Sequence, residues 1–292
     1  MINICEVGLR DGLQNEKKGI TTEHKISLIK KLIDAGIKKF EAVSFVNPKI
    51  IPQMADAEEV IKQAPKLDDV SYAGLVLSHS GLERALKTDI DTLHIVMATS
   101  NEFNMKNARR TVDQSINELT AVTSEGISEN RNITATLGTA FGCPYEGDIP
   151  LKHILHISES FIQSGATNIT LADTTGVANP QQVANIVKQF KEYFGESIQL
   201  GLHFHNTRGL GLANVLAGYL NGVRDFDSSI GGLGGCPFAP KAIGNVCTED
   251  MVNMFHEMNV NTNTNLETLV NSSKWLEKRL DKQLDGMMMK II

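Results

Sequence analysis

Apolar residues along the chain follow two alternating patterns from one end to the other. Short runs rich in β-branched and other apolar residues predict strands, and longer stretches with apolar residues three or four positions apart predict helices. Leu28 and Leu32, for example, belong to a pattern that predicts a helix over residues 21–35. The predicted strands cover residues 2–9, 39–45, 70–77, 91–98, 132–141, 167–173, 198–204 and 225–232, and the predicted helices cover residues 21–35, 55–65, 80–87, 109–124, 150–164, 180–194, 210–221 and 248–258.

Eight strand–helix units in continuous alternation predict an α/β protein with a parallel sheet. Their number and spacing match a (β/α)8 TIM barrel. A doubly wound open sheet is the structural alternative, but no GxGxxG pattern follows the first predicted strand. Helical patterns continue to the end of the chain, so residues 1–292 are expected to form a single TIM-barrel catalytic domain. Residues from about 263 to 292 are expected to be a C-terminal helical extension packed on the barrel.

The composition narrows the class of protein without naming an activity. The chain has 292 residues, of which 41% are hydrophobic and 21% charged, and its formal net charge is −6. It has no concentrated basic stretch of the kind that binds nucleic acid, and no apolar run of the roughly 18 to 20 residues that span a bilayer. The start of the chain carries no signal-peptide pattern, and the four cysteines have no CxxC spacing. We therefore expect a cytoplasmic protein that binds neither nucleic acid nor a membrane.

Two histidines on one strand raise the first chemical question. His203 and His205 are two positions apart near the end of the strand at 198–204, so they point to the same face. In a TIM barrel, the carboxyl ends of the strands form the active-site face. Polar and glycine-rich segments recur at these predicted ends, namely at Arg10 and Asp11, at Glu41, at Asp173, at His203 to Asn206, and at 231–237 followed by Asn245.

The simplest common explanation of these residues is a divalent metal ion. Asp11 can supply a carboxylate oxygen, His203 and His205 ring nitrogens, and Asn245 an amide oxygen. This mixed set suits Mn²⁺, Mg²⁺, Zn²⁺ or Fe²⁺. Two histidines and one carboxylate also describe the iron site of an oxygenase, and the spacing alone does not separate these alternatives.

Two further residues are candidates for catalysis. Arg10 can form an ion pair with Glu41, or it can stabilise an enolate or a carbonyl oxygen near the metal. Cys236 lies in the glycine-rich segment 231–237, which is expected to be a mobile loop that brings the thiol to the site for acid–base work. A buried, unreactive cysteine is the alternative.

Several motifs of the chain resemble the hydroxymethylglutaryl-CoA lyase family, within the metal-dependent TIM-barrel lyases, over roughly residues 3–260. They are EVGLRDGLQNEK (6–17), FEAVSFVNPKIIPQMAD (40–56), GCPYEG (142–147), LADTTGVANP (171–180), HFHNTRG (203–209) and GGLGGCPFAP (231–240) with the trailing Asn245. The glycine-rich motif is specific to the lyases, because related condensing enzymes carry a GxGER-type run in this place.

The resemblance implies roles for individual residues. Asp11, His203, His205 and Asn245 would hold Mg²⁺ or Mn²⁺, and Arg10 would steady a thioester enolate with acidic Glu41 nearby. Cys236 would take part in proton transfer, and Lys106 and Asn107 would lie close to coenzyme A. The expected partners are an acyl-CoA thioester substrate and a second copy of the chain in a homodimer. The family often has Asp where this chain has Asn206, a position that would contact a metal ligand from behind.

The implied reaction is the retro-Claisen cleavage of 3-hydroxy-3-methylglutaryl-CoA to acetyl-CoA and acetoacetate. The first general base is left open between Asp11 and a histidine. Alternatives are the same chemistry on a related 3-hydroxyacyl-CoA such as citramalyl-CoA, a synthase that condenses an acyl-CoA with a 2-oxo acid, and a catalytically silent metal-binding protein.

Overall fold

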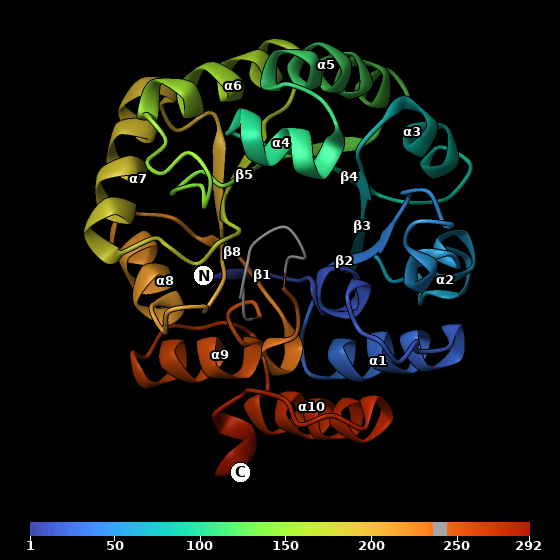
Figure 1. The fold of residues 1–292 in the computed structure, drawn as a ribbon. Coiled ribbons are helices and arrows are strands. Elements are labelled where there is room, and N and C mark those ends of the chain that lie inside the picture. Colours follow the sequence, from blue (N-terminus) through green and yellow to red (C-terminus); the bar gives the residue numbers. More distant parts are fainter. Residues whose placement is uncertain (236–243) are drawn as a thin grey trace.

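The structure is a computed structural model that describes residues 1–235 and 244–292 of the chain. Eight parallel strands form a closed barrel, in which each strand pairs with its neighbours in chain order and β8 pairs with β1. The predicted TIM barrel is therefore confirmed, and Figure 1 shows the helices as a ring around it. The strands are β1 (Asn3–Glu6), β2 (Lys39–Ser44), β3 (Ser71–Val76), β4 (Thr92–Ala98), β5 (Asn132–Gly138), β6 (Asn168–Asp173), β7 (Gln199–Phe204) and β8 (Asp225–Ser228).

The helices begin where the sequence supplies capping residues. The Thr111 hydroxyl accepts a hydrogen bond from the Gln114 backbone N–H, and the Gln114 side chain accepts one from the Thr111 N–H, a capping box that starts α5. Asn179 caps α7, which then begins with Pro180. The helices are α1 (Thr22–Asp34), α2 (Ala57–Gln63), α3 (His79–Ala85), α4 (Asn101–Ala108), α5 (Val112–Ser128), α6 (Leu151–Gln163), α7 (Pro180–Phe194), α8 (Gly211–Leu220), α9 (Thr248–Glu257) and α10 (Leu266–Leu280).

Some predicted boundaries were wrong, and each has a local cause. The strand expected at 2–9 ends at Glu6, because residues Gly8–Gly12 form a π-helical turn. The strand expected at 132–141 ends at Gly138, where Thr139 takes a left-handed conformation with φ of 57°. The strand expected at 225–232 gives way to a 3₁₀ turn after Ser228.

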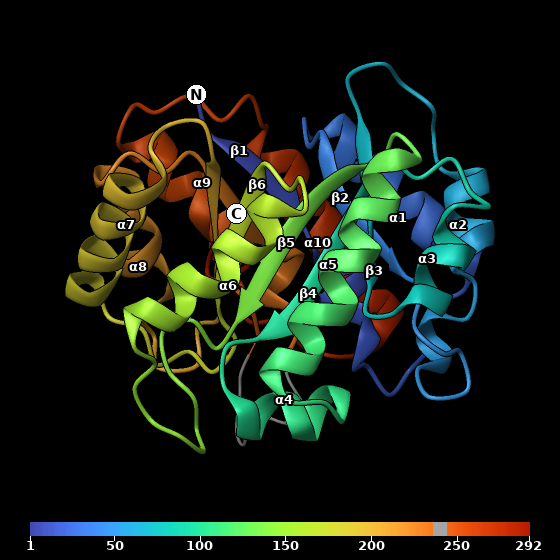
Figure 2. The ribbon, with the colours of Figure 1, turned by 90° about the horizontal axis from the view of Figure 1, so that it is seen from above.

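One helix was missed. Helix α4 follows β4, and only Phe103 and Asn104 are buried in it. Its sequence therefore shows no stripe of apolar residues that would have predicted a helix. Figure 2 shows α4 at the end of the barrel toward which β4 and β5 point. This is the carboxyl end of the strands, where a TIM barrel places its active site.

The hydrophobic core lies between the barrel and the helices, whereas the inside of the barrel is polar. Outward-facing residues such as Phe40, Leu93 and Leu202 have no exposed surface. Small or polar side chains such as Thr134 and Thr170 face a cavity of about 250 Å³ inside the barrel. This part of the interior is lined mainly by small and polar residues, in place of the bulky branched side chains that usually fill a barrel.

The end of the chain lies outside the ring of helices. Helix α10 packs against α1 and α9, as Figure 1 shows, and it buries Leu269 and Leu276 completely. Among the described residues, no helix combines the length and the apolar composition needed to cross a membrane.

Candidate metal centre and active site

The turn after β1 presents Arg10 and Asp11 side by side. The Val7 carbonyl accepts hydrogen bonds from the backbone N–H groups of Arg10, Asp11 and Gly12 at 2.8–3.3 Å, which gives the π-helical geometry. A Cβ atom at Gly8 would lie 2.6 Å from the Glu6 Oε1 oxygen, so any larger residue there would displace the Glu6 side chain or the turn. Such π-turns are frequent at functional sites, because they re-aim side chains at the end of an element.

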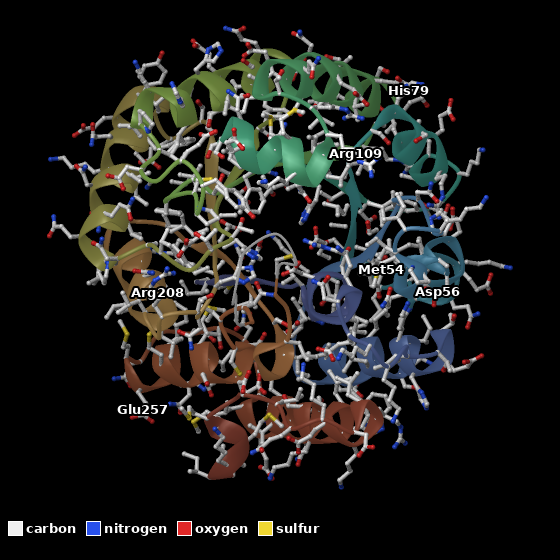
Figure 3. The ribbon with its side chains drawn as sticks, viewed as in Figure 1. Met54, Asp56, His79, Arg109, Arg208 and Glu257 are labelled. Atoms are coloured by element: carbon white, nitrogen blue, oxygen red, sulfur yellow. The ribbon has the colours of Figure 1, made fainter. Side chains whose placement is uncertain are left out.

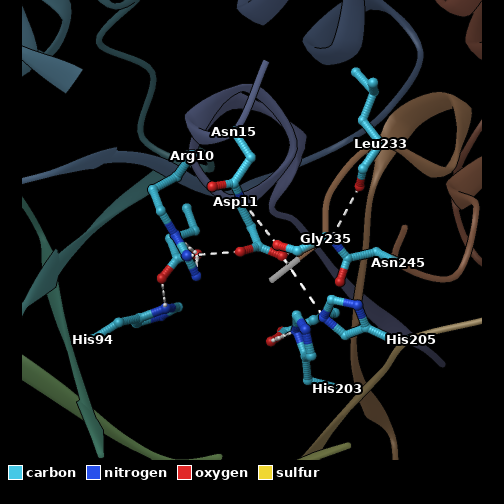
Figure 4. Close-up of polar contacts among 11 residues, drawn as sticks. Arg10, Asp11, Asn15, His94, His203, His205, Leu233, Gly235 and Asn245 are labelled. Atoms are coloured by element: carbon cyan, nitrogen blue, oxygen red, sulfur yellow. Dashed lines mark hydrogen bonds and ion pairs between the residues drawn. The ribbon is translucent and has the colours of Figure 1, made fainter. Parts of the chain in front are cut away.

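Asp11 lies at the centre of the site. Its Oδ1 oxygen accepts a hydrogen bond from Arg10 Nη1 at 2.8 Å, and its Oδ2 oxygen accepts one from Asn245 Nδ2 at 2.7 Å. Figure 4 shows Asp11 between Arg10 on one side and the two histidines on the other. Burial alone would raise the pKa of the Asp11 carboxyl, but Arg10 and then the two histidines outweigh it and lower that pKa. Asp11 is therefore an anion in the folded protein.

The two histidines face Asp11 from the end of β7. The Nε2 atom of His205 lies 4.0 Å from Asp11 Oδ2, and the His203 and His205 ring centroids are 5.2 Å apart. One donor atom from each of Asp11, His203 and His205 lies within 4.8 Å of the others. All three residues sit at the carboxyl end of the barrel, so the structure brings together the acid and the two imidazoles that the sequence suggested.

Asp227 on β8 orients His203 from behind. Its Oδ2 oxygen lies 3.1 Å from His203 Nδ1, which leaves Nε2 for the site. Burial alone would lower the pKa of the His203 ring, but the contact with Asp227 outweighs it and raises that pKa. Asn206, which was expected to contact a metal ligand from behind, accepts through its Oδ1 atom from the Gly211 N–H at the start of α8. The i, i+2 spacing of Asp225 and Asp227 could have pointed to an inward-facing carboxylate.

Asn245 supplies the test of whether the site suits a metal ion. Its side chain is 3% exposed, and its Nδ2 group donates to Asp11 and to the Leu233 carbonyl at 3.0 Å. Its Oδ1 oxygen is buried and finds no hydrogen-bond partner among the described residues. A buried acceptor without a donor is expensive in a native fold, so it points to an absent partner. An oxygen of this kind beside a carboxylate and two imidazoles fits a divalent cation.

Arg10 is held in place by Glu41, as the sequence led us to expect. Arg10 Nε donates to Glu41 Oε2 at 2.6 Å, and Nη2 contacts the same oxygen. Burial alone would raise the pKa of the Glu41 carboxyl, but Arg10 and His94 outweigh it and lower that pKa. His94 on β4, a residue that sequence reasoning missed, lies 3.0 Å from Glu41 Oε1 through its Nδ1 atom.

The loops after β6 and β7 are hydrogen-bonded to each other. Arg208 lies beside α7 and α8 in Figure 3, and its Nη1 donates to the carbonyls of Thr175 and Gly176 at 3.0 and 2.9 Å. Asp173 accepts two backbone N–H groups, from Val177 and Ala178, both at 2.9 Å. Burial raises the pKa of the Asp173 carboxyl to about 6. The Asp173 carboxyl group thus holds the backbone of the loop after β6 in place.

Three predicted residues are not joined to this cluster by the described contacts. Cys236 lies outside the described residues. Lys106 and Asn107 are exposed on α4, and Lys106 Nζ lies 4.8 Å from the Tyr145 ring centroid. The glycine-rich segment is described up to Gly235. The Gly235 carbonyl accepts a hydrogen bond at 2.8 Å from Nδ2 of Asn15, which lies between the π-helical turn and α1.

The fold and the site define a TIM-barrel protein with a candidate divalent-metal centre at the carboxyl ends of its strands. The HMGL-like family profile matches residues 1–275, and the chain belongs to this family. The enzymes of this family are metal-dependent, and this chain is a lyase.

Individual relatives match along nearly the whole chain. Hydroxymethylglutaryl-CoA lyase YngG of Bacillus subtilis is 41% identical over 97% of this chain and 94% of its own length. The (R)-citramalyl-CoA lyase of Chloroflexus aurantiacus is 34% identical over 98% of this chain and 93% of its own length. The structure of an HMG-CoA lyase from A. baumannii with coenzyme A and 3-methylmalate superposes with a TM-score of 0.95 at 42% identity, covering 100% of this chain and 95% of that one.

Proposed function

We propose that the chain cleaves 3-hydroxy-3-methylglutaryl-CoA to acetyl-CoA and acetoacetate. The observation that carries the proposal is the placement of Arg10 against Asp11, whose carboxylate faces His203 and His205 within 4.8 Å. The Arg10 guanidinium is therefore held beside the candidate metal site, where its positive charge can stabilise an enolate that forms during the reaction. The identity of 41% with a hydroxymethylglutaryl-CoA lyase supports the same substrate.

The resident ion is proposed to be Mg²⁺ or Mn²⁺. Asp11 and Asn245 would supply oxygen ligands, and His203 and His205 would supply nitrogen ligands. A divalent cation held there would act as a Lewis acid that eases deprotonation of the tertiary hydroxyl of the substrate. Asp227 would keep the His203 ring oriented for binding. Zinc and iron remain the alternatives, and metal analysis of the purified protein separates them.

The bond changes then follow from the residues of the chain. A base, Asp11 or a histidine, takes the hydroxyl proton as the C2–C3 bond breaks. The electron pair of that bond passes into the thioester, where the Arg10 guanidinium stabilises the enolate oxygen. A proton returns to the C2 carbon, and acetyl-CoA and acetoacetate leave. Cys236 is the proposed participant in this proton transfer.

The coenzyme is proposed to lie along α4. Lys106 and Asn107 are exposed on this helix at the carboxyl end of the barrel, and a lysine ammonium there suits a phosphate group. The coenzyme A in the structure from A. baumannii supports an acyl-CoA substrate for this chain.

We also propose that the protein is a cytoplasmic homodimer. The described cysteines Cys5, Cys143 and Cys247 are all free thiols, which suits a reducing compartment. Sedimentation of the purified protein tests the dimer.

The direct test is the release of acetoacetate from the proposed substrate by chelator-stripped protein, with and without Mg²⁺ or Mn²⁺. We expect release only with metal, and loss of release in His203→Ala. Protein that binds the metal but releases no acetoacetate would exclude this substrate.

A second candidate substrate is citramalyl-CoA, because the chain is also 34% identical to a citramalyl-CoA lyase. Cleavage of that thioester releases pyruvate in place of acetoacetate. The ratio of kcat/KM for the two thioesters decides between them. Incubation of acetyl-CoA with a 2-oxo acid tests for the condensing reaction of a synthase.

A further inference from the structure

His94 makes a contact that crosses a whole strand of the barrel. It lies on β4 and reaches Glu41 on β2, although β3 separates these two strands. The residue of β3 in register with Glu41 is Ala73. Because Ala73 projects only a methyl group into the barrel, the imidazole and the carboxylate can meet over it.

Glu41 depends on this contact for one of its two oxygens. The side chain is 2% exposed, and its Oε2 oxygen is fully used by Arg10. Its Oε1 oxygen has His94 Nδ1 at 3.0 Å as its partner. An ionised carboxylate only accepts hydrogen bonds, so Nδ1 must carry the proton of the imidazole. His94 is therefore a donor to Glu41.

His94 also lines a cavity inside the barrel. This cavity of about 250 Å³ is lined as well by polar residues such as Thr92 and Thr134. A polar cavity of this size holds water, because its walls offer several hydrogen-bonding groups. The Nε2 atom can therefore be solvated while Nδ1 stays on Glu41, and the imidazole needs no other side chain to complete its hydrogen bonds.

The contacts form one continuous chain from this cavity to the metal site. His94 contacts Glu41, Glu41 holds Arg10 by two of its nitrogens, and Arg10 Nη1 donates to Asp11 at 2.8 Å. Only the last two members of this chain face the proposed reaction.

We propose that His94 is a positioning residue that sets the geometry of Arg10 through Glu41. With the Oε1 oxygen anchored, the carboxylate presents Oε2 to Arg10 in one orientation, and Nη1 stays directed at Asp11. Without His94, Oε1 is a buried acceptor with no donor among the described residues, so the carboxylate rotates and the guanidinium loses its fixed direction. This inference rests on the proposed role of Arg10 in the lyase reaction.

The first test compares three variants at His94 and β4. His94→Leu removes the donor, His94→Asn keeps an amide N–H near the position of Nδ1, and Thr92→Val changes a neighbouring wall of the same cavity. We expect His94→Leu to lower kcat roughly 10- to 100-fold, the range of one hydrogen bond to a charged group, with KM changed less than threefold. His94→Asn should recover most of the loss, and Thr92→Val should match the wild type.

The second test needs no activity. In ¹⁵N-labelled metal-free protein, the Arg10 Nε–H signal, assigned by its absence in Arg10→Lys, should be shifted and protected from exchange. It should move and exchange faster in His94→Leu. Ala73→Val keeps His94 but wedges it away from Glu41, and it should cause the same change.

The outcomes separate this inference from the proposed function. An unchanged Arg10 signal in both His94→Leu and Ala73→Val overturns the role of His94, whatever the activity. A changed signal in protein that cleaves none of the thioesters supports the positioning of Arg10 and refutes the lyase function instead. An equal loss of kcat in His94→Leu and Thr92→Val would overturn the role of His94, because it would show only a general effect of the cavity wall.

Discussion

The Oδ2 oxygen of Asp227 lies 3.1 Å from the Nδ1 atom of His203. The two residues come from neighbouring strands, where His203 of β7 is in register with Asp227 of β8. A carboxylate in this place fixes the tautomer and the ring orientation of a metal-binding histidine. The pairing places Asp227, one of the two aspartates of β8, next to a histidine of the candidate metal centre.

Replacing Asp227 should weaken metal binding. We expect Asp227→Asn to lower the affinity for Mn²⁺ roughly 10- to 100-fold, the usual effect of losing such a partner. The measurement is Mn²⁺ titration followed by electron paramagnetic resonance. Asp225→Asn is the matched control, because Asp225 is on the same strand and pairs with Asn3 and Lys39. Equal affinities in the wild type and Asp227→Asn would contradict the role of Asp227.

Arg10→Lys should lower kcat and leave the affinity for the metal ion nearly unchanged. A lysine cannot contact Glu41 and Asp11 through separate nitrogens as the guanidinium does. We expect kcat to fall on the order of 100- to 1000-fold, the range for loss of a donor to a developing oxyanion. Mn²⁺ affinity, measured in the same preparation, should stay within a few-fold of the wild type. A variant with normal kcat would show that Arg10 does not contact the reacting group.

Glu6 should make stability depend on pH. Burial raises the pKa of this carboxyl from 4.5 to about 7, although Thr248 and two backbone N–H groups donate to it. Between these two pH values, the folded protein binds more protons than the unfolded chain, so its free energy of unfolding falls as the pH rises. This loss is on the order of 3 kcal/mol for the whole shift.

Glu6→Gln removes the titration and keeps acceptors for both backbone groups. Urea unfolding at a series of pH values should therefore show a flatter dependence for Glu6→Gln than for the wild type from pH 4.5 to about 7. Parallel curves for the two proteins would show that Glu6 is not the group responsible.

Gly8→Ala should destabilise the turn that presents Arg10 and Asp11. A Cβ there would lie 2.6 Å from Glu6 Oε1 and 2.9 Å from Ile230 Cγ2, so the buried Glu6 and Ile230 side chains or the turn itself must shift. Overpacking of this kind costs about 1–3 kcal/mol, and the midpoint of thermal unfolding should fall accordingly. Gly19→Ala is the control, because a Cβ at Gly19 meets nothing within 4 Å. The idea fails if both variants melt with the wild type.

Much of the candidate site could be predicted because its members lie at the ends of strands. The His203 and His205 pair follows from the alternation of one strand, and Asp11 follows from the rule that strand ends meet at one face. The ion pair between Arg10 and Glu41 was also anticipated, and the structure confirms it. Their metal-binding and catalytic roles stay predictions.

Apart from α4, the sequence by itself determined the order of strands and helices, because burial imposes a local period of two or of 3.6 residues on each element. It also favoured a barrel over a doubly wound open sheet, because eight strand–helix units alternate and no GxGxxG pattern follows the first strand, and the structure confirms the closure. Only the tertiary structure decided which polar groups meet inside. The contact of His94 with Glu41 depends on strand register and on the small size of Ala73. The contact of Asp227 with His203 depends on the register of β7 and β8. No local pattern along the chain encodes either contact.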